Sequence, residues 1–238
     1  TPRLLRAHWA GIRAQLGDAG LPTVEFYGHK ESSGPKRCFS NFYEHAPFDF
    51  TLPASCGSAA LLAAARPATV PVTFTEKAIM LCKAAIMGDL KTYDDIVAAS
   101  TPAQAKALGR NVSPFDAAKW DALVCDVARA VCTQKFAAVA GLRETLLGTG
   151  ERLIAEMTRN DRNWGTGLDV GHADAGRPER WPGTNILGWA LMEARTTLRS
   201  GGGDAPMPAD GEGSPGRKRK ANRGGRRGGR LQTDYMID

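Results

Sequence analysis

The stretch TFTEKAIMLCKAAIMGD, residues 73–89, has the composition of a helix but carries two charged side chains within its apolar face. With about 100° of rotation per residue, Lys83 lies about 20° from Glu76 on a helical wheel. Met80 and Met87 fall on the same face. A face that should enter the core therefore carries a carboxylate and an ammonium group two turns apart.

A structural explanation exists for Glu76. Residues 73–76 match the S/T-x-x-E capping box, in which Glu76 would bond back to the amide of Thr73. Capping does not explain Lys83, which would have to extend out of the apolar face or reach a partner. Burial lowers the pKa of a lysine, and such a lysine is a nucleophile toward carbonyl carbons. Helix geometry alone leaves open whether this pair is structural or reactive.

The rest of the chain predicts a helix-dominated α+β fold, a single domain with a small β-sheet. The segments TVEFYGHK (residues 23–30) and PFDFTL (47–52) have the aromatic and β-branched content of short strands. The Ala-rich segment 53–73 is bounded by prolines and predicts a surface excursion with room for one short helix. From residue 73 to 199 the pattern is mainly helical.

Several helix boundaries can be predicted from local signals. In STPAQ, residues 100–104, a Ser or Thr N-cap precedes a proline at the first helical position. SPFD, residues 113–116, is expected to open the next helix in the same way. A final amphipathic helix is predicted within residues 184–200.

Composition favours an intracellular protein without a membrane partner, metal or cofactor. No segment approaches the roughly 18 consecutive apolar residues of a membrane span, and the first residues lack the apolar core of a secretory signal. The five cysteines are odd in number and include no C-x-x-C pair, which favours free thiols. The four histidines are scattered along the chain, so no metal site is expected from them.

The C-terminal segment, residues 200–238, is rich in Gly, Pro and charge and predicts a disordered tail. Residues 201–238 hold eight Lys or Arg against five Asp or Glu, half of the net charge of +6. Within the tail, GRKRK resembles a nuclear localisation cluster and RGGRRGGR resembles nucleic-acid-binding RGG segments. These features suggest nucleic-acid contact and a cytoplasmic or nuclear location. The alternative is a solvated tail with no specific partner.

The loop FSNF, residues 39–42, places Asn41 between Phe39 and Phe42. An amide flanked by aromatic rings suits a planar base or a sugar. The alternative is that the rings close a core while Asn41 caps a turn.

A second candidate loop is NDRNWGTGLD, residues 160–169. Here Asp161 precedes Trp164, which can stack on a ligand. Gly165 and Gly167 would let backbone amides approach that ligand closely. A Gly-x-Gly alone also marks an ordinary turn.

The motif LGR, residues 108–110, ends a predicted helix. Gly109 suits the helix end, and the guanidinium of Arg110 suits a phosphate group.

In their order along the chain, several motifs closely resemble the NADAR superfamily. They are EFYG, FSNFY, TEKAIMLCKAAIMGD, ALGRNVSPFDAAKWD, QKF, LLGTGERLIAEMTRNDRNWGTG and WPGTNILGWALMEAR. The resemblance covers roughly residues 24–199, leaving residues 1–23 as an N-terminal helical extension and 200–238 as the tail. It implies a helix-rich α+β fold with one pocket where the FSNF loop, the Glu76/Lys83 helix and the D-x-x-W-G loop meet.

The resemblance also implies hydrolysis of an N-glycosidic bond between ribose C1 and an amino nitrogen. Some members, the bacterial YbiA-like N-glycosidases, act on a riboflavin precursor that carries an amino-linked ribose phosphate. Others remove ADP-ribose from the exocyclic amino group of guanine in nucleic acid. The motif residues carried over onto this chain are Asn41, Glu76, Lys83, Gly109, Arg110, Trp120, Asp161, Trp164, Gly165 and Gly167; Phe39 and Phe42 complete the candidate set.

The chain departs from the bacterial members at three places. Lys77 follows the motif glutamate where those members often have histidine, and the segments 53–73 and 169–180 are longer than theirs. These departures put the small-molecule substrate in doubt more than the reaction. With the basic tail, they favour ADP-ribosylated guanine in DNA, RNA or a nucleotide as the partner.

Two mechanisms fit the candidate residues. In one, Lys83 captures ribose C1 as a Schiff base while Glu76 and Asp161 move protons. In the other, water attacks C1 directly and Lys83 supplies only electrostatic stabilisation. Two other functions remain open, a riboflavin-intermediate N-glycosidase and a non-catalytic ADP-ribose or NAD-binding module.

Overall fold

A computed structural model of the protein describes residues 1–16 and 20–201. The predicted tail therefore lies outside the described residues, apart from its first two positions. The helices are α1 (Pro2–Leu16), α2 (Ser58–Ala63), α3 (Thr75–Met87), α4 (Leu90–Ala98), α5 (Pro102–Arg110), α6 (Ala117–Ala138), α7 (Leu142–Leu147) and α8 (Ile186–Ser200). The strands are β1 (Thr23–Phe26), β2 (Phe48–Thr51), β3 (Thr69–Val72) and β4 (Leu153–Glu156). The helix-rich α+β prediction is confirmed.

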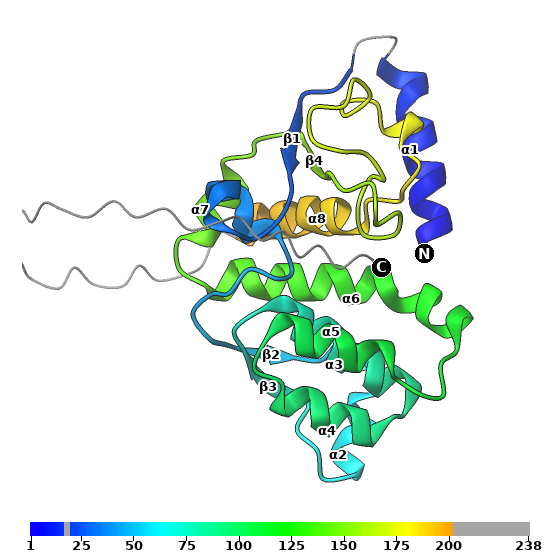
Figure 1. The fold of residues 1–238 in the computed structure, drawn as a ribbon, viewed down its shortest axis with the longest axis vertical. Helices are drawn as coiled ribbons and strands as arrows, with labels where there is room; N and C mark the ends of the chain where they lie inside the picture. The colour runs from blue at the N-terminus through cyan, green and yellow to red at the C-terminus, as the bar shows by residue number, and fades with distance from the viewer. Residues whose placement is uncertain (17–19, 202–238) are drawn as a thin grey trace, which may run out of the picture.

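Helix α6 crosses the middle of the molecule, with α8, β1 and β4 on one side and α3, α4, α5, β2 and β3 on the other (Figure 1). Two apolar faces explain this position. Val127 and Val131 belong to the cluster built around α3, whereas Val124 and Ala128 belong to the cluster built around α8. One helix thus joins both halves of the core.

The strands form two separate two-stranded sheets, which corrects the prediction of one small sheet. The predicted strands at residues 23–30 and 47–52 exist but do not pair with each other. β1 pairs in parallel with β4, a short apolar strand inside the region predicted to be helical. β2 pairs antiparallel with β3, so segment 53–73 contributes a strand as well as the expected short helix.

Helix α3 begins at Thr75 without a side-chain cap, so the capping box considered as the structural explanation of Glu76 does not form. Phe74 is 1% exposed and takes the extended N-cap conformation, which leaves Thr73 outside the helix. The carbonyl of Asn41 instead accepts the amide hydrogen of Glu76 at 2.9 Å. A loop from another part of the chain therefore replaces the local cap.

The predicted boundaries agree with the structure for α5 and α8, but the predicted start of α6 does not. Thr101 caps α5 in a complete capping box with Gln104, and Pro102 occupies the first turn. Helix α6 begins later than SPFD predicted, because the side chain of Asp116 accepts the amide hydrogen of Lys119. The peptide bond between Ser113 and Pro114 is cis.

All five cysteines are free, as predicted, and all five are buried. Among the helices of the described ranges, none has the length and apolar content needed to cross a bilayer.

Candidate active site

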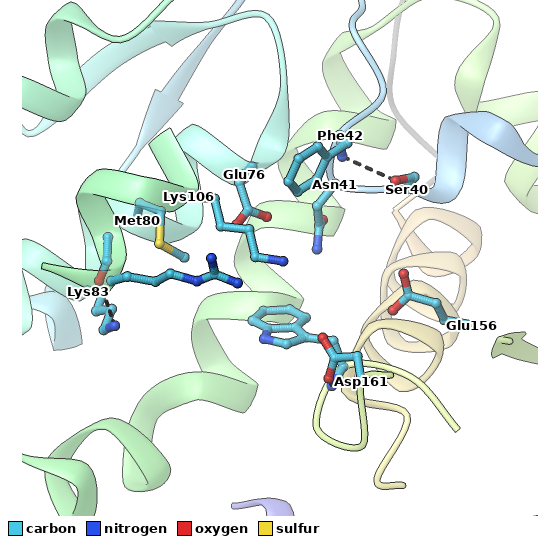
Figure 2. Close-up of a pocket in the computed structure, with 12 residues that line it drawn as sticks. Ser40, Asn41, Phe42, Glu76, Met80, Lys83, Lys106, Glu156 and Asp161 are labelled. Atoms are coloured by element: carbon cyan, nitrogen blue, oxygen red, sulfur yellow. Dashed lines mark hydrogen bonds between the residues drawn. The ribbon is translucent and has the colours of Figure 1, made fainter. Parts of the chain in front are cut away.

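One pocket lies between the two halves of the molecule, and side chains from four separate regions line it (Figure 2). They come from the FSNF loop, α3, α5, and the end of β4 with the loop that follows. The lining residues are Ser40, Asn41, Phe42, Glu76, Met80, Lys83, Lys106, Gly109, Arg110, Glu156, Asp161 and Trp164.

Hydrogen bonds fix the FSNF loop to the start of α3. The hydroxyl of Thr75 donates to Oδ1 of Asn41 at 3.0 Å, and the Glu76 amide donates to the Asn41 carbonyl. Behind the loop, the fully buried Lys135 donates through Nζ to the Ser40 carbonyl at 3.1 Å. These contacts hold Glu76 at the pocket wall.

Helix α5 packs closely against α3 and supplies cations. Gly109 allows the approach, since a Cβ at this position would overlap the side chain of Met80. Nζ of Lys83 donates to the Gly109 carbonyl at 2.7 Å. Lys106 and Arg110 lie one turn apart on the same face of α5. Figure 2 shows Lys106 extending toward the middle of the pocket.

The opposite wall carries two carboxylates. Glu156 ends β4, where its amide donates to Oδ1 of Asn185 at 3.0 Å. Oδ1 of Asp161 accepts the amide hydrogens of Asn163 and Trp164 at 2.9 and 2.8 Å. This turn leaves Trp164 lining the pocket beside Asp161.

Burial dominates the electrostatics of the pocket. It raises the pKa of Glu76 from 4.5 to about 7, with Asp161 adding repulsion and Lys106 opposing the shift. Burial likewise raises the pKa of Glu156 from 4.5 to about 8, and the charges of Asp161 and Glu76 add to it. Burial lowers the pKa of Lys83, against the attraction of Glu76. The pocket therefore holds protonated carboxyl groups near neutral pH next to an amine that deprotonates more readily than usual.

The structure brings most of the predicted residues together. Those that line the pocket are Asn41, Phe42, Glu76, Lys83, Gly109, Arg110, Asp161 and Trp164.

Four predicted residues do not line the pocket. Phe39 packs in the core against Phe26 and Phe136, and Trp120 packs between the two main core clusters. Gly165 lies against β4, where a Cβ would come within 2.9 Å of the Glu156 carbonyl oxygen. Gly167 adopts a positive φ of 77° next to Pro182. These four residues support the site from behind. They do not line the pocket, where a ligand contact was expected of them.

Four lining residues were missed as site residues: Ser40, Met80, Lys106 and Glu156. The sequence contains a signal for Lys106, which precedes Arg110 by four residues and so shares its helix face. Glu156 ends the apolar run LIAE, and only the pairing of β4 with β1 shows that this end faces a pocket.

Within the described residues, no group of three or more His, Cys, Asp or Glu side chains is arranged to hold a metal ion.

Comparison with known proteins shows what this chain is similar to. Residues 25–199 match the NADAR domain family. The chain is 34% identical over 120 residues to N-glycosidase R617 of Acanthamoeba polyphaga mimivirus, covering 50% of this chain and 71% of that protein. It is 30% identical over 128 residues to Protein irg-1 of Caenorhabditis elegans, covering 53% and 60% of the two chains. It is 34% identical over 110 residues to N-glycosidase YbiA of Escherichia coli strain K12, covering 46% and 62%.

The fold of YbiA is also similar. The NMR structure of the E. coli protein superposes with a TM-score of 0.56 at 24% identity, covering 81% of this chain and 94% of that one. The aligned regions span about 60% of the length of irg-1 and of YbiA, and somewhat more of the viral relative. Because the family match extends over most of the chain and includes every pocket-lining residue, the protein belongs to the NADAR domain family.

Proposed function

We propose that the protein is an N-glycosidase that hydrolyses the bond between ribose C1 and an amino nitrogen. Its substrate in this proposal is guanine that carries ADP-ribose on the exocyclic amino group, in nucleic acid or in a nucleotide. The observation that carries the proposal is the joint presence, in one pocket, of carboxyl groups with raised pKa and a lysine with lowered pKa. The viral and bacterial relatives named N-glycosidases support the reaction class.

The pKa values suggest a division of roles. Glu156, with a pKa of about 8, keeps its proton near neutral pH and can protonate the leaving amine. Glu76, with a pKa of about 7, can both accept and donate a proton. Asp161 lies on the same wall and raises both values, so it favours the protonated forms of its neighbours.

The proposed reaction has two half-steps. Opening of the ribose ring breaks the bond between C1 and the ring oxygen, the oxygen takes the proton of the guanine amino nitrogen, and C1 becomes doubly bonded to that nitrogen. The neutral amine of Lys83 then adds to C1, and its extra proton passes to the guanine nitrogen. The C1–N bond to guanine then breaks, the nitrogen keeps the electron pair and takes a proton from a pocket carboxyl group, and C1 remains joined to Lys83 as an iminium. Water, deprotonated by the carboxylate so formed, adds to C1 and releases the ribose, which restores the lysine amine.

Charge supports a phosphate-bearing substrate. Lys106 and Arg110 line the same pocket as the carboxylates, and a guanidinium suits diphosphate oxygens. The basic tail would add non-specific attraction to a nucleic-acid backbone, which is the reason to favour ADP-ribosylated guanine over a riboflavin precursor.

The deciding experiment compares two substrates, a DNA oligonucleotide with ADP-ribosylated guanine and the riboflavin precursor with an amino-linked ribose phosphate. We expect mass spectrometry to detect free ADP-ribose and unmodified guanine from the oligonucleotide. Glu76→Gln should lower this release strongly, whereas Lys91→Ala, at an exposed surface ion pair with Asp95, should not. Release of ribose phosphate alone would favour the riboflavin-pathway reaction. Binding of ADP-ribose without any turnover would identify a binding module.

The tail can be tested separately by deleting residues 201–238. We expect turnover of the oligonucleotide to fall and its dependence on salt to weaken, while turnover of a modified mononucleotide stays the same. Equal turnover of the oligonucleotide by both forms would show that the tail has no part in substrate capture.

A further inference from the structure

Phe115 is a large apolar side chain that remains 49% exposed, in the segment between α5 and α6. Its ring centroid lies 4.6 Å from Nζ of Lys83, which lines the pocket. Phe115 itself does not line the pocket. The ring therefore stands at the rim, beside the amine that the proposed reaction uses.

The backbone around Phe115 is anchored on both sides. The amide of Ser113 donates to Oδ2 of Asp89 at 2.9 Å, and the amide of Asp116 is 3.3 Å from the sulfur of Met87. Asp89 also caps α4 by accepting the amide hydrogen of Thr92. The backbone that carries the ring is thus fixed beside the C-terminal end of α3, and preorganisation of this kind lowers the entropy cost of binding.

Two other aromatic side chains near the site are less suited to a base outside the pocket. Phe42 and Trp164 are half-buried and line the interior. The ring of Phe42 is already approached by another ring, that of His29, at 5.6 Å between centroids.

We infer that Phe115 is the stacking platform for the departing base at the pocket rim, and hence a binding contact that favours base-linked ADP-ribose over free ADP-ribose. This inference rests on the proposed function. A guanine that belongs to a nucleic-acid strand keeps its sugar-phosphate backbone outside the pocket, and an exposed aromatic ring at the rim can stack on its base. In the proposed reaction Lys83 and the leaving nitrogen are both bonded to C1, so the departing base is within reach of the Phe115 ring. Stacking on an aromatic ring is worth about 1–3 kcal/mol per base, because every base presents a π-face to the ring.

The test compares Phe115→Ala with the wild-type protein on the ADP-ribosylated oligonucleotide. Loss of one stacked base should lower kcat/KM by about 5- to 100-fold. The inhibition constant of free ADP-ribose should stay unchanged, because ADP-ribose lacks the departing base. Phe115→Trp keeps an aromatic face and should retain kcat/KM near the wild-type value. Leu62→Ala, at an exposed apolar residue of α2, is the matched control and should change neither quantity.

Two results would overturn the inference. One is a kcat/KM of Phe115→Ala equal to that of the wild-type protein. The other is an inhibition constant of ADP-ribose that rises by the same factor as kcat/KM falls, which would place adenine on Phe115 instead. Absence of turnover by the wild-type protein would reject the proposed function itself, whereas turnover without an effect of Phe115 rejects only the platform. The thermal midpoint of each variant establishes that it is folded.

Discussion

Lys83 illustrates how neighbours define a residue's chemistry. On the sequence it is a charge within an apolar helix face, and in the structure it donates to the Gly109 carbonyl and lies over Phe115 at the edge of a pocket. Burial lowers its pKa, which increases the neutral, nucleophilic fraction.

Borohydride reduction during turnover should trap substrate on Lys83 if the Schiff-base route operates. We expect peptide mass spectrometry to find the reduced adduct at Lys83 in the wild-type protein and no adduct in Lys83→Arg, whose guanidinium stays protonated. Lys106→Ala serves as the control, because Lys106 is the other lysine that lines the pocket. An active protein that yields no adduct would support direct attack by water, and an adduct that disappears only in Lys106→Ala would move the nucleophile to α5.

Glu76 makes the stability of the fold depend on pH. Its pKa rises from 4.5 to about 7 on folding, so between these values the folded state binds more protons than the unfolded state. Stability should therefore fall as pH rises through this window. Glu76→Gln has no charge to bury and should be more stable than the wild-type protein at about pH 8, by up to about 3 kcal/mol, but not at about pH 4. Urea unfolding at the two pH values measures this difference, and a difference that is the same at both would contradict the assignment.

At the scale of elements, the contact of α8 with β4 positions one wall of the pocket. Asn185 precedes α8 and bonds the edge of β4 that faces away from β1, accepting from the Glu156 amide and donating to the Ile154 carbonyl. Gly188 allows this approach, because a Cβ there would overlap the Ile154 carbonyl oxygen. The carbonyl belongs to a paired strand and cannot move aside easily.

Gly188→Ala should separate α8 from β4 and displace Glu156. We expect the free energy of unfolding to fall by about 1–3 kcal/mol, together with a lower kcat. Gly11→Ala is the matched control in α1, since no atom lies within 4 Å of its added Cβ, and it should be neutral or slightly stabilising. Equal stability of the two variants would show that the helix can shift at no cost.

At the scale of the whole molecule, Trp9 of α1 completes a small core cluster that includes residues of β4 and Trp181. Trp9 is 2% exposed, packs against Trp181 at 5.4 Å between ring centroids, and donates through Nε1 to the Thr184 carbonyl at 2.8 Å. Residues of α1 precede the family match and do not line the pocket.

Trp9→Ala should therefore act on stability and not on chemistry. We expect the free energy of unfolding to fall by about 3–5 kcal/mol, with kcat/KM of the folded protein unchanged. Leu4 lies on the same helix and is 67% exposed, so Leu4→Ala should alter neither the free energy of unfolding nor kcat/KM. A selective loss of activity in a stable Trp9→Ala protein would instead connect α1 to the site.

Local sequence signals determined the helix-rich class and the boundaries of α5 and α8, because periodicity and caps act within a few residues. They also identified Glu76 and Lys83 as charges within an apolar helix face, and the loop that holds Asp161 as a candidate ligand-binding loop. The pairing of β1 with β4 and of β2 with β3 was not predicted, since short strands of similar composition do not specify their partners over long separations.

The tertiary structure alone decided how the polar groups are used. The cap of α3 comes from Asn41, far away in the chain, so the local capping box did not form. Glu156 became part of the site because β4 ends at the pocket wall. The raised pKa values of Glu76 and Glu156 arise from burial and from carboxylates contributed by different segments, and such long-range contacts leave no local pattern in the sequence.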